Sequence, residues 1–125
     1  MDLPKPVVLV LAVSPSGRVV LTRDHRFPEG RWGLVAGYIE RDERPEDAAL
    51  RELQEETGLT GHDSRLVGGD YHGDNVMFCV RCSVPETQPQ PEPGTIVELA
   101  APSVERMVSD SPAARLVAKL LASQI

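Results

Sequence analysis

The stretch GYIERDERPEDAALRELQEETGL, from Gly37 to Leu59, decides the fold and the chemistry of this chain. It holds eight acidic residues and three arginines, a net charge of −5, whereas all 125 residues together carry −6. Three of the acids, Glu52, Glu55 and Glu56, lie almost next to one another. Carboxylates placed that closely repel each other, so they favour either full hydration or a bound cation.

The same stretch carries the signals of an amphipathic helix. Pro45 suits a first turn, Glu46 and Asp47 suit the positive end of the helix dipole, and Gly58 suits the C-terminal cap. With residues placed every 100° around the axis, the three glutamates share an arc of roughly 100°, and the small Ala48 lies beneath them. The adjoining stripe, expected to pack on a sheet, consists of Ala49, Leu50, Leu53 and Thr57.

The acidic face of this helix has more than one interpretation. Most acidic runs are solvated faces, and such faces usually include lysines one turn away from the acids. No lysine occurs between Pro45 and Thr57. Clustered carboxylate oxygens suit hard divalent cations, Mg²⁺ or Mn²⁺, better than zinc or copper. The sequence therefore predicts a metal-binding face, with a solvated helix or a protein-contact helix as the alternatives.

The spacing of the stretch resembles a known family motif. Gly37, five residues, Glu43, seven residues and then RELQEETGL, ending at Leu59, match the Nudix box. The resemblance to Nudix hydrolases implies an α+β fold, an α/β/α sandwich with a mixed sheet and the box helix packed on it. It also implies hydrolysis of the diphosphate bond in a nucleoside diphosphate linked to another moiety, X, with release of a mononucleotide. At this length we expect one domain, residues 1–125.

Roles carry over from the family only at the matching positions. The resemblance implies a metal site whose oxygen ligands are Glu52, Glu55, Glu56 and the carbonyl of Gly37.

The resemblance also implies that Glu43 pairs with Arg51, and a bidentate arginine can hold carboxylates at a fixed spacing. One carboxylate must accept a proton from the attacking water. Glu52 and Glu55 are the candidates inside the box, and Glu98 is the candidate outside it.

One position departs from the usual family pattern. The residue before Glu43 is commonly glycine, and here it is Asp42. Aspartate tolerates a left-handed backbone better than most residues, so we expect the turn before the helix to be kept.

The choice of X depends on residues outside the box. The lead-in RFPEGRWGLVAGYIE resembles NADH and ADP-ribose pyrophosphatases more than the enzymes that sanitise nucleoside triphosphates. The ending SPAARLVAKLLA also resembles NADH-type members, although YHGDNVMF stands where those have SQPWPFPxS, and their zinc-binding module is missing. We expect NADH, ADP-ribose or a related substrate. The alternatives are a (deoxy)nucleoside triphosphate pyrophosphohydrolase and a nucleotide-binding regulator without catalysis.

Several side chains outside the box are candidates for contact with a nucleotide. Trp32 and Tyr71 could stack on a base, and Arg26 could meet a phosphate, as could Arg23 or Arg31. The alternative places Trp32 in the core, Tyr71 at a strand end and the arginines in solvent. The three histidines have no partners at ligand spacing, and we expect them on the surface.

The rest of the chain reads as strands followed by a final helix. Apolar periodicity and turn residues predict strands at 7–13, 18–22, 32–36, 65–69, 76–83 and 95–99. Four prolines within 85–94 predict an extended surface loop. Ser111-Pro112 caps a helix at 113–122. Its inward residues are expected to be Leu116, Val117, Leu120 and Leu121.

Composition narrows the function classes. Hydrophobic content of 41% and charged content of 26% are ordinary for a globular protein. The longest apolar run, Val7–Val13, is too short to span a membrane, and the N-terminus lacks a secretory signal, so a cytoplasmic location is expected. Nearly all excess negative charge lies in the box, which argues against a nucleic-acid surface. Family resemblance suggests a homodimer.

The two cysteines, Cys79 and Cys82, form one CVRC motif. A structural zinc site needs four ligands, and a strand here would turn the two thiols to opposite faces. We interpret them as ordinary reduced cysteines.

Overall fold

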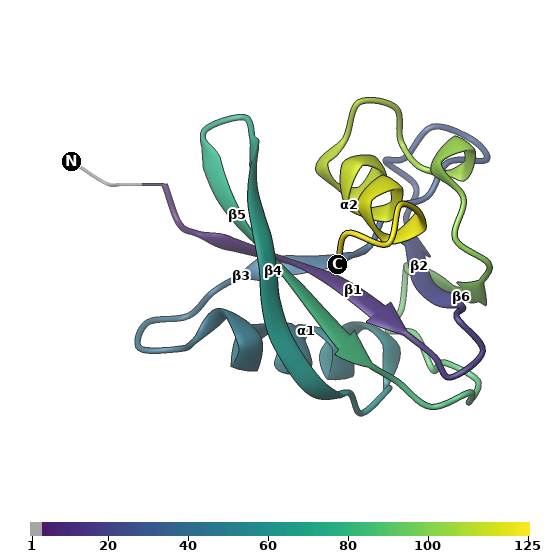
Figure 1. Ribbon diagram of the computed structural model, residues 1–125, viewed down its shortest axis with the longest axis horizontal. Coiled ribbons are helices and arrows are strands. Elements are labelled where there is room, and N and C mark those ends of the chain that lie inside the picture. Colours follow the sequence, from purple (N-terminus) through teal and green to yellow (C-terminus); the bar gives the residue numbers. More distant parts are fainter. Residues whose placement is uncertain (1–3) are drawn as a thin grey trace.

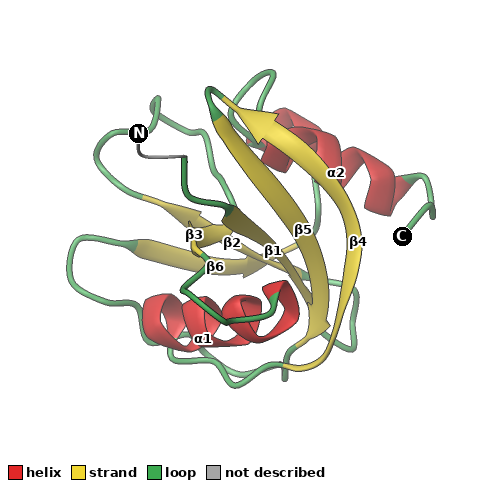
Figure 2. Ribbon diagram, turned by 90° about the vertical axis from the view of Figure 1, so that its left-hand side faces the viewer, coloured by secondary structure: helices red, strands yellow, loops and turns green. Residues whose placement is uncertain are grey.

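The computed structural model describes residues 4–125, and within that range two helices cover the two faces of one mixed sheet (Figures 1 and 2). This arrangement is the expected α+β sandwich. In chain order the elements are β1 (Val7–Val13), β2 (Val19–Arg23), β3 (Val35–Tyr38), α1 (Pro45–Thr57), β4 (His62–His72), β5 (Asn75–Ser83), β6 (Ile96–Ala100), the 3₁₀ helix η1 (Val104–Arg106) and α2 (Pro112–Leu121). None of the helices in residues 4–125 is long and apolar enough to cross a membrane.

Strand β1 is the centre of the sheet. The strand order is β4-β5-β1-β2-β6, and β3 also pairs with β1. β1 runs parallel to β5 and antiparallel to β2 and β3. The side chains of β1 point alternately into the hydrophobic core on each face of the sheet, which explains its uninterrupted apolar sequence. The pairing of Val8 with Gly37 brings the start of the box to the middle of the sheet.

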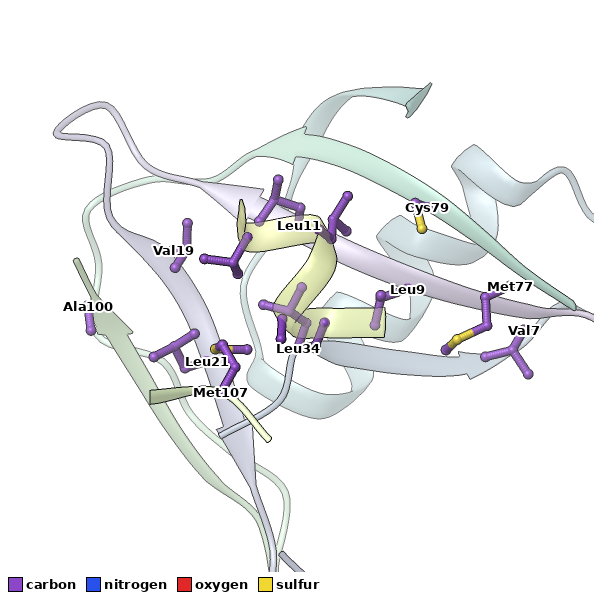
Figure 3. Close-up of a cluster of buried hydrophobic side chains, with 14 residues drawn as sticks. Val7, Leu9, Leu11, Val19, Leu21, Leu34, Met77, Cys79, Ala100 and Met107 are labelled. Carbon is purple, nitrogen blue, oxygen red and sulfur yellow. The ribbon is translucent and has the colours of Figure 1, made fainter. Parts of the chain in front are cut away.

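The pleat of the strands divides the core into two clusters. One lies on the α2 side and includes Leu9, Leu34 and Met77 (Figure 3). The other lies on the α1 side. Cys79 belongs to the first cluster and Cys82 to the second, so the thiols face opposite sides of the sheet as predicted. Burial raises the pKa of both thiols, that of Cys82 to about 11, which keeps both protonated and unreactive.

The structure corrects three details of the predicted elements. β3 begins at Val35, because the main chain of Trp32 pairs with Met107 and that of Gly33 with Thr22. β4 is much longer than predicted, because it follows β5 along its length through two register shifts. Leu121 was expected to face inward but is 54% exposed, since it lies in the last turn of α2, past the edge of the core.

The proline-rich segment 85–94 is attached to the body of the protein, although the sequence predicted only an extended surface loop. The Gln90 N–H donates to the Thr57 carbonyl at 2.7 Å, and the Glu92 N–H donates to the Glu56 carbonyl at 3.3 Å. The Glu86 carboxylate accepts from the Ser16 N–H at 2.6 Å. The segment therefore satisfies carbonyl groups that the last turn of α1 would otherwise leave without partners.

Candidate active site

The turn before α1 is fixed by its backbone. Asp42 has a φ of 63°, so the left-handed turn predicted at this position is confirmed. The Glu43 N–H donates to the Glu40 carbonyl at 3.1 Å, and the Glu40 N–H donates to the Glu43 carboxylate at 3.0 Å. At the other end of α1, Gly58 adopts the expected left-handed cap with a φ of 72°. Both ends of the box helix are thus set by local sequence.

The packing face of α1 is wider than the projection indicated. Ala49, Leu53 and Thr57 are buried against the sheet as expected. Ala48, expected beneath the carboxylates, is also fully buried in the α1-side cluster. The reason is that α1 lies flat over β1, β3 and β5, so the helix surface on both sides of Ala49 meets the sheet. The carboxylates are left to emerge at the edge of this contact.

At Gly37, a side chain of α1 packs directly against the main chain of β3. A Cβ atom built on Gly37 would overlap the carboxyl group of Glu52. Only glycine therefore lets this carboxylate rest against the main chain of β3. Glu52 is correspondingly enclosed, with 14% of its side chain exposed.

Arg51 links the acidic side chains to one another. Its guanidinium donates to both carboxylate oxygens of Glu43, at 2.8 and 2.9 Å, and to the Tyr38 carbonyl at 3.0 Å. It also donates to Glu52 at 3.0 Å and to Glu55 at 3.3 Å. The hydrogen bond to Glu43 raises the pKa of Arg51, and the same bond lowers the pKa of Glu43. This bidentate contact is the pairing of Glu43 with Arg51 that the family resemblance implied.

Of the three helical glutamates, Glu56 lies where a negative charge is least favourable. Its Oε2 atom is buried and has no hydrogen-bond partner among the described residues. The pKa of Glu56 is raised to about 8, first of all by burial and then by the neighbouring carboxyl group of Glu52, with smaller contributions from the charges of Glu92 and Glu55. A buried carboxylate beside another carboxylate is stable only with a proton or a cation between them.

The donor set at this position fits a divalent cation. Within residues 4–125 no three acidic, histidine or cysteine side chains are already arranged as a metal-binding group. Glu55 is 55% exposed and turned toward Arg51. The Glu56 side chain, whose Oε2 has no hydrogen-bond partner among the described residues, nevertheless lies beside Glu52. The Glu52 carboxylate in turn packs directly against the main chain of Gly37. Hard oxygen donors of this kind are those that Mg²⁺ and Mn²⁺ prefer.

The predicted nucleotide-contact residues lie in different surroundings. The guanidinium groups of Arg23 and Arg106 stand over the Trp32 ring, 5.8 and 5.3 Å from its centre, so protein cations already engage this ring. Tyr71 is 69% exposed near the end of β4. Arg26 forms an ion pair with Asp24 at 2.5 Å and lines a cavity that also touches Gly37.

Glu98, the candidate base outside the box, does not lie on the same face as the helical glutamates. Glu98 forms an ion pair with Arg106 at 2.8 Å, and its neighbours Val97 and Leu99 pack on the α1-side cluster. Strand alternation therefore turns Glu98 to the opposite face, away from the helical glutamates. Glu92 belongs to the predicted surface loop 85–94, and its charge lies close enough to Glu56 to raise the pKa of that carboxyl. Sequence alone gives no signal for that contact.

Comparison with known proteins establishes the family. The NUDIX domain model matches residues 3–122, so this chain belongs to the Nudix family and is a Nudix hydrolase. A MutT structure described for Aliivibrio salmonicida and Vibrio cholerae superposes with a TM-score of 0.79 at 17% identity, covering 96% of this chain and 98% of that one. A Nudix hydrolase from Nitrosomonas europaea gives a TM-score of 0.78 at 21% identity, covering 99% and 76%.

Two curated relatives match the chain locally. The NAD-capped RNA hydrolase NUDT12 of Macaca fascicularis is 46% identical over 59 residues, and the NAD-capped RNA hydrolase NudC of Mycobacterium tuberculosis is 40% identical over 63 residues. The matched segments make up 46% and 50% of this chain but only 13% and 20% of those proteins. The chain thus corresponds to a small part of each relative.

Proposed function

We propose that this Nudix hydrolase cleaves the diphosphate bond of a nucleoside diphosphate linked to a moiety X, such as NADH or ADP-ribose, and releases a mononucleotide with Mg²⁺ or Mn²⁺ as cofactor. The observation that carries the proposal is the buried, unpaired Oε2 of Glu56 beside the Glu52 carboxylate on Gly37. A folded protein retains such an arrangement when a cation completes it.

Each residue of the cluster has a role in this proposal. Glu52, Glu56 and the Gly37 carbonyl would hold the cation, with Glu55 as a further ligand. When bound, the cation would neutralise diphosphate charge and lower the pKa of the water that attacks phosphorus. Arg51, fixed by Glu43, keeps Glu52 and Glu55 at a constant spacing.

The proton of the attacking water goes to a carboxylate of the cluster. Glu52 and Glu55 are the candidates within the box, because Arg51 holds both in the cluster by hydrogen bonds.

The lead-in to the box supports a dinucleotide or nucleotide-sugar substrate rather than a nucleoside triphosphate. Two relatives are NAD-capped RNA hydrolases, so an RNA with an NAD cap belongs among the test substrates. The expectation that nucleic acid is not a partner is thereby tested directly.

A substrate panel tests the reaction. NADH, ADP-ribose, a dinucleoside polyphosphate, dGTP and an NAD-capped RNA are each incubated with Mg²⁺ or Mn²⁺, and mononucleotide release is measured. We expect Glu56→Gln to lower kcat at least about 10²-fold, and the matched variant Glu46→Gln, on the same helix and paired with Arg44, to keep normal activity.

Calorimetric titration with Mn²⁺ separates the alternatives. Mn²⁺ binding to the normal protein that Glu56→Gln weakens supports the metal site. Absence of Mn²⁺ binding would show that the acidic helix is a solvated or protein-contact surface. Nucleotide binding without turnover of any panel member would favour the regulator.

A further inference from the structure

Positively charged side chains gather on the α2 side of the sheet, at its β4 edge. Arg65 of β4 and Arg81 of β5 are directly opposite each other in the strand register. Residues that are opposite in an antiparallel pair point to the same face of the sheet. The Arg81 guanidinium donates to the main-chain oxygen of Ile125 at 2.7 Å, and Ile125 packs on the α2-side core. Both arginines therefore point to the α2 side.

Lys119 adds a third positive charge to this cluster. It lies in the last turn of α2, and Figure 2 shows α2 beside β4. The Lys119 ammonium is 3.9 Å from the position that a Cβ atom would take on Gly68 of β4. The pKa of Asp70, also in β4, is lowered first by the hydrogen bond from Arg115 and least by the charge of Lys119. We call the three cations from β4, β5 and α2 the basic strip: Arg65, Arg81 and Lys119.

The protein leaves the charges of the basic strip largely uncompensated. Among residues 4–125, neither Arg65 nor Lys119 takes part in an ion pair. Asp70, the acid near Lys119, is already paired with Arg115 at 2.7 Å. Like charges directly opposite each other on a sheet destabilise it. The facing pair of Arg65 and Arg81 therefore costs stability that a bound anion would restore.

The basic strip lies close to the proposed reaction site. Gly37 is paired with Val8, and Val8 with Phe78 of β5, three residues before Arg81. A strand spacing of about 4.8 Å and a rise of about 3.3 Å per residue place Arg81 roughly 14 Å from Gly37. The box, which carries −5 of the net charge of −6, lies on the α1 side. An anionic chain extending from a nucleotide at the carboxylate cluster is thus repelled on the α1 side and attracted on the α2 side.

We infer that the basic strip binds the phosphodiester backbone of a single-stranded RNA whose 5′ nucleotide is held at the carboxylate cluster. The inference rests on the proposed function and names a nucleotide-capped RNA as the substrate class of that site. The short distance to Gly37 favours a chain attached to the substrate over a separate membrane or acidic protein.

Salt dependence gives the inference a magnitude. Each phosphate contact with a single strand contributes about 0.7 to the slope of log affinity against log salt concentration. About two to three contacts therefore predict a slope of about −1.4 to −2.1, which is a loss of about 7- to 18-fold in affinity between about 50 and 200 mM salt.

Binding of uncapped RNA to the metal-free protein tests the strip without requiring hydrolysis. A labelled single-stranded RNA is titrated with protein in EDTA at about 50 and 200 mM salt, and its fluorescence anisotropy is measured. The double variant Arg65→Gln, Lys119→Gln changes two exposed side chains, so it should fold normally. We expect it to weaken RNA binding at least about fivefold at the lower salt concentration and to reduce the slope by about 1.4.

The matched control is the double variant Arg18→Gln, Arg44→Gln, which removes the same charge from two other exposed positions. It should change RNA binding by less than about twofold. Equal weakening by both double variants would refute the inference, because net charge alone would then explain the binding. RNA binding that does not depend on salt would refute it as well. Binding to phosphatidylserine vesicles without binding to RNA would assign the strip to a membrane and overturn it.

The two proposals fail differently in the hydrolysis assay. With NAD-capped RNA as substrate, we expect the double variant Arg65→Gln, Lys119→Gln to raise KM at least about fivefold with kcat unchanged, and to leave both constants for NADH unchanged. If RNA binds to the strip but neither NADH nor NAD-capped RNA is hydrolysed, the proposed function fails and the strip stands. If both are hydrolysed and the variant leaves the KM for NAD-capped RNA unchanged, the function stands and the strip assignment fails.

Discussion

The two faces of the sheet near Gly37 are built from opposite chemistry. On the α1 side, Arg51 joins the three carboxylates of Glu43, Glu52 and Glu55 through charged hydrogen bonds, and one oxygen of Glu56 has no hydrogen-bond partner among the described residues. On the α2 side of the sheet, a groove of about 250 Å³ is lined mostly by apolar side chains, among them Leu9, Phe27 and Leu34. Among the described residues, the charged face gathers the carboxylates that could hold a cation, whereas the lining on the other face is mostly apolar. The two faces can therefore be altered separately by substitution.

Gly37→Ala should have the largest effect, because it disturbs the residue shared by both faces. The added methyl group would overlap the Glu52 carboxyl and force it away from β3. We expect kcat/KM to fall at least about 10³-fold, since the proposed metal ligand Glu52 would be displaced.

The matched control for that change is Gly68→Ala in β4, where an added Cβ would make only an ordinary contact with Lys119. Near-normal activity of Gly37→Ala, measured as mononucleotide release, would contradict the placement of the site at this residue.

Arg51→Lys tests the α1 face alone. Lysine keeps the charge but cannot donate to both oxygens of Glu43 and to the Tyr38 carbonyl at once. We expect kcat to fall about 10²-fold and the free energy of unfolding to fall by about 1–3 kcal/mol. A kcat that stays normal in Arg51→Lys, measured as mononucleotide release, would show that the bidentate contact with Glu43 is not needed for the reaction.

The sequence was informative wherever neighbours along the chain determine the structure. Pro45, Asp42 and Gly58 indicated the turn and both ends of α1, and the family resemblance implied the pairing of Glu43 with Arg51. Alternation along β5 correctly separated Cys79 from Cys82. These features depend on local backbone preferences and on periodicity, which a single sequence contains.

Features that depend on distant segments were not predictable in this way. Trp32 is engaged by Arg106, and Glu56 meets the main chain of Glu92, through loops whose path no periodicity specifies. The groove likewise combines β1, β3, β5 and the start of α2. Only the packing of the sheet brings those segments together, so Glu98 was a reasonable candidate by sequence although it lies on the wrong face.

Glu56→Gln should show that the buried Glu56 carboxyl makes the stability of the protein depend on pH. The pKa of Glu56 is about 8 in the folded protein, against an ordinary value of 4.5. As pH rises above about 4.5, the unfolded chain loses this proton while the folded chain keeps it, so the free energy of unfolding falls until about pH 8. Glutamine carries no such proton, and we expect the metal-free variant to be more stable by about 1–3 kcal/mol at pH 9.

Urea unfolding with EDTA at pH 4 and pH 9 measures this difference, which should be small at pH 4. Excess Mn²⁺ should reduce or reverse it at pH 9, because the cation stabilises the ionised carboxylate. A variant less stable than the normal protein at pH 9 without metal would show that Glu56 is already satisfied in the folded state.

The smallest effect is expected at the helix caps, where the two faces also differ. Ser111 caps α2 through its hydroxyl, which accepts from the Ala114 N–H at 3.1 Å, whereas Arg44 at the start of α1 forms no side-chain cap bond. Ser111→Ala should therefore lower the free energy of unfolding by about 1 kcal/mol, and Arg44→Ala by less than about 0.5 kcal/mol. Because Ser111 lies on the α2 side of the sheet, Ser111→Ala should leave kcat unaltered. Denaturant unfolding and mononucleotide release measured on the same two variants give both quantities, and a change in kcat for Ser111→Ala would mean that the α2 side takes part in the reaction itself.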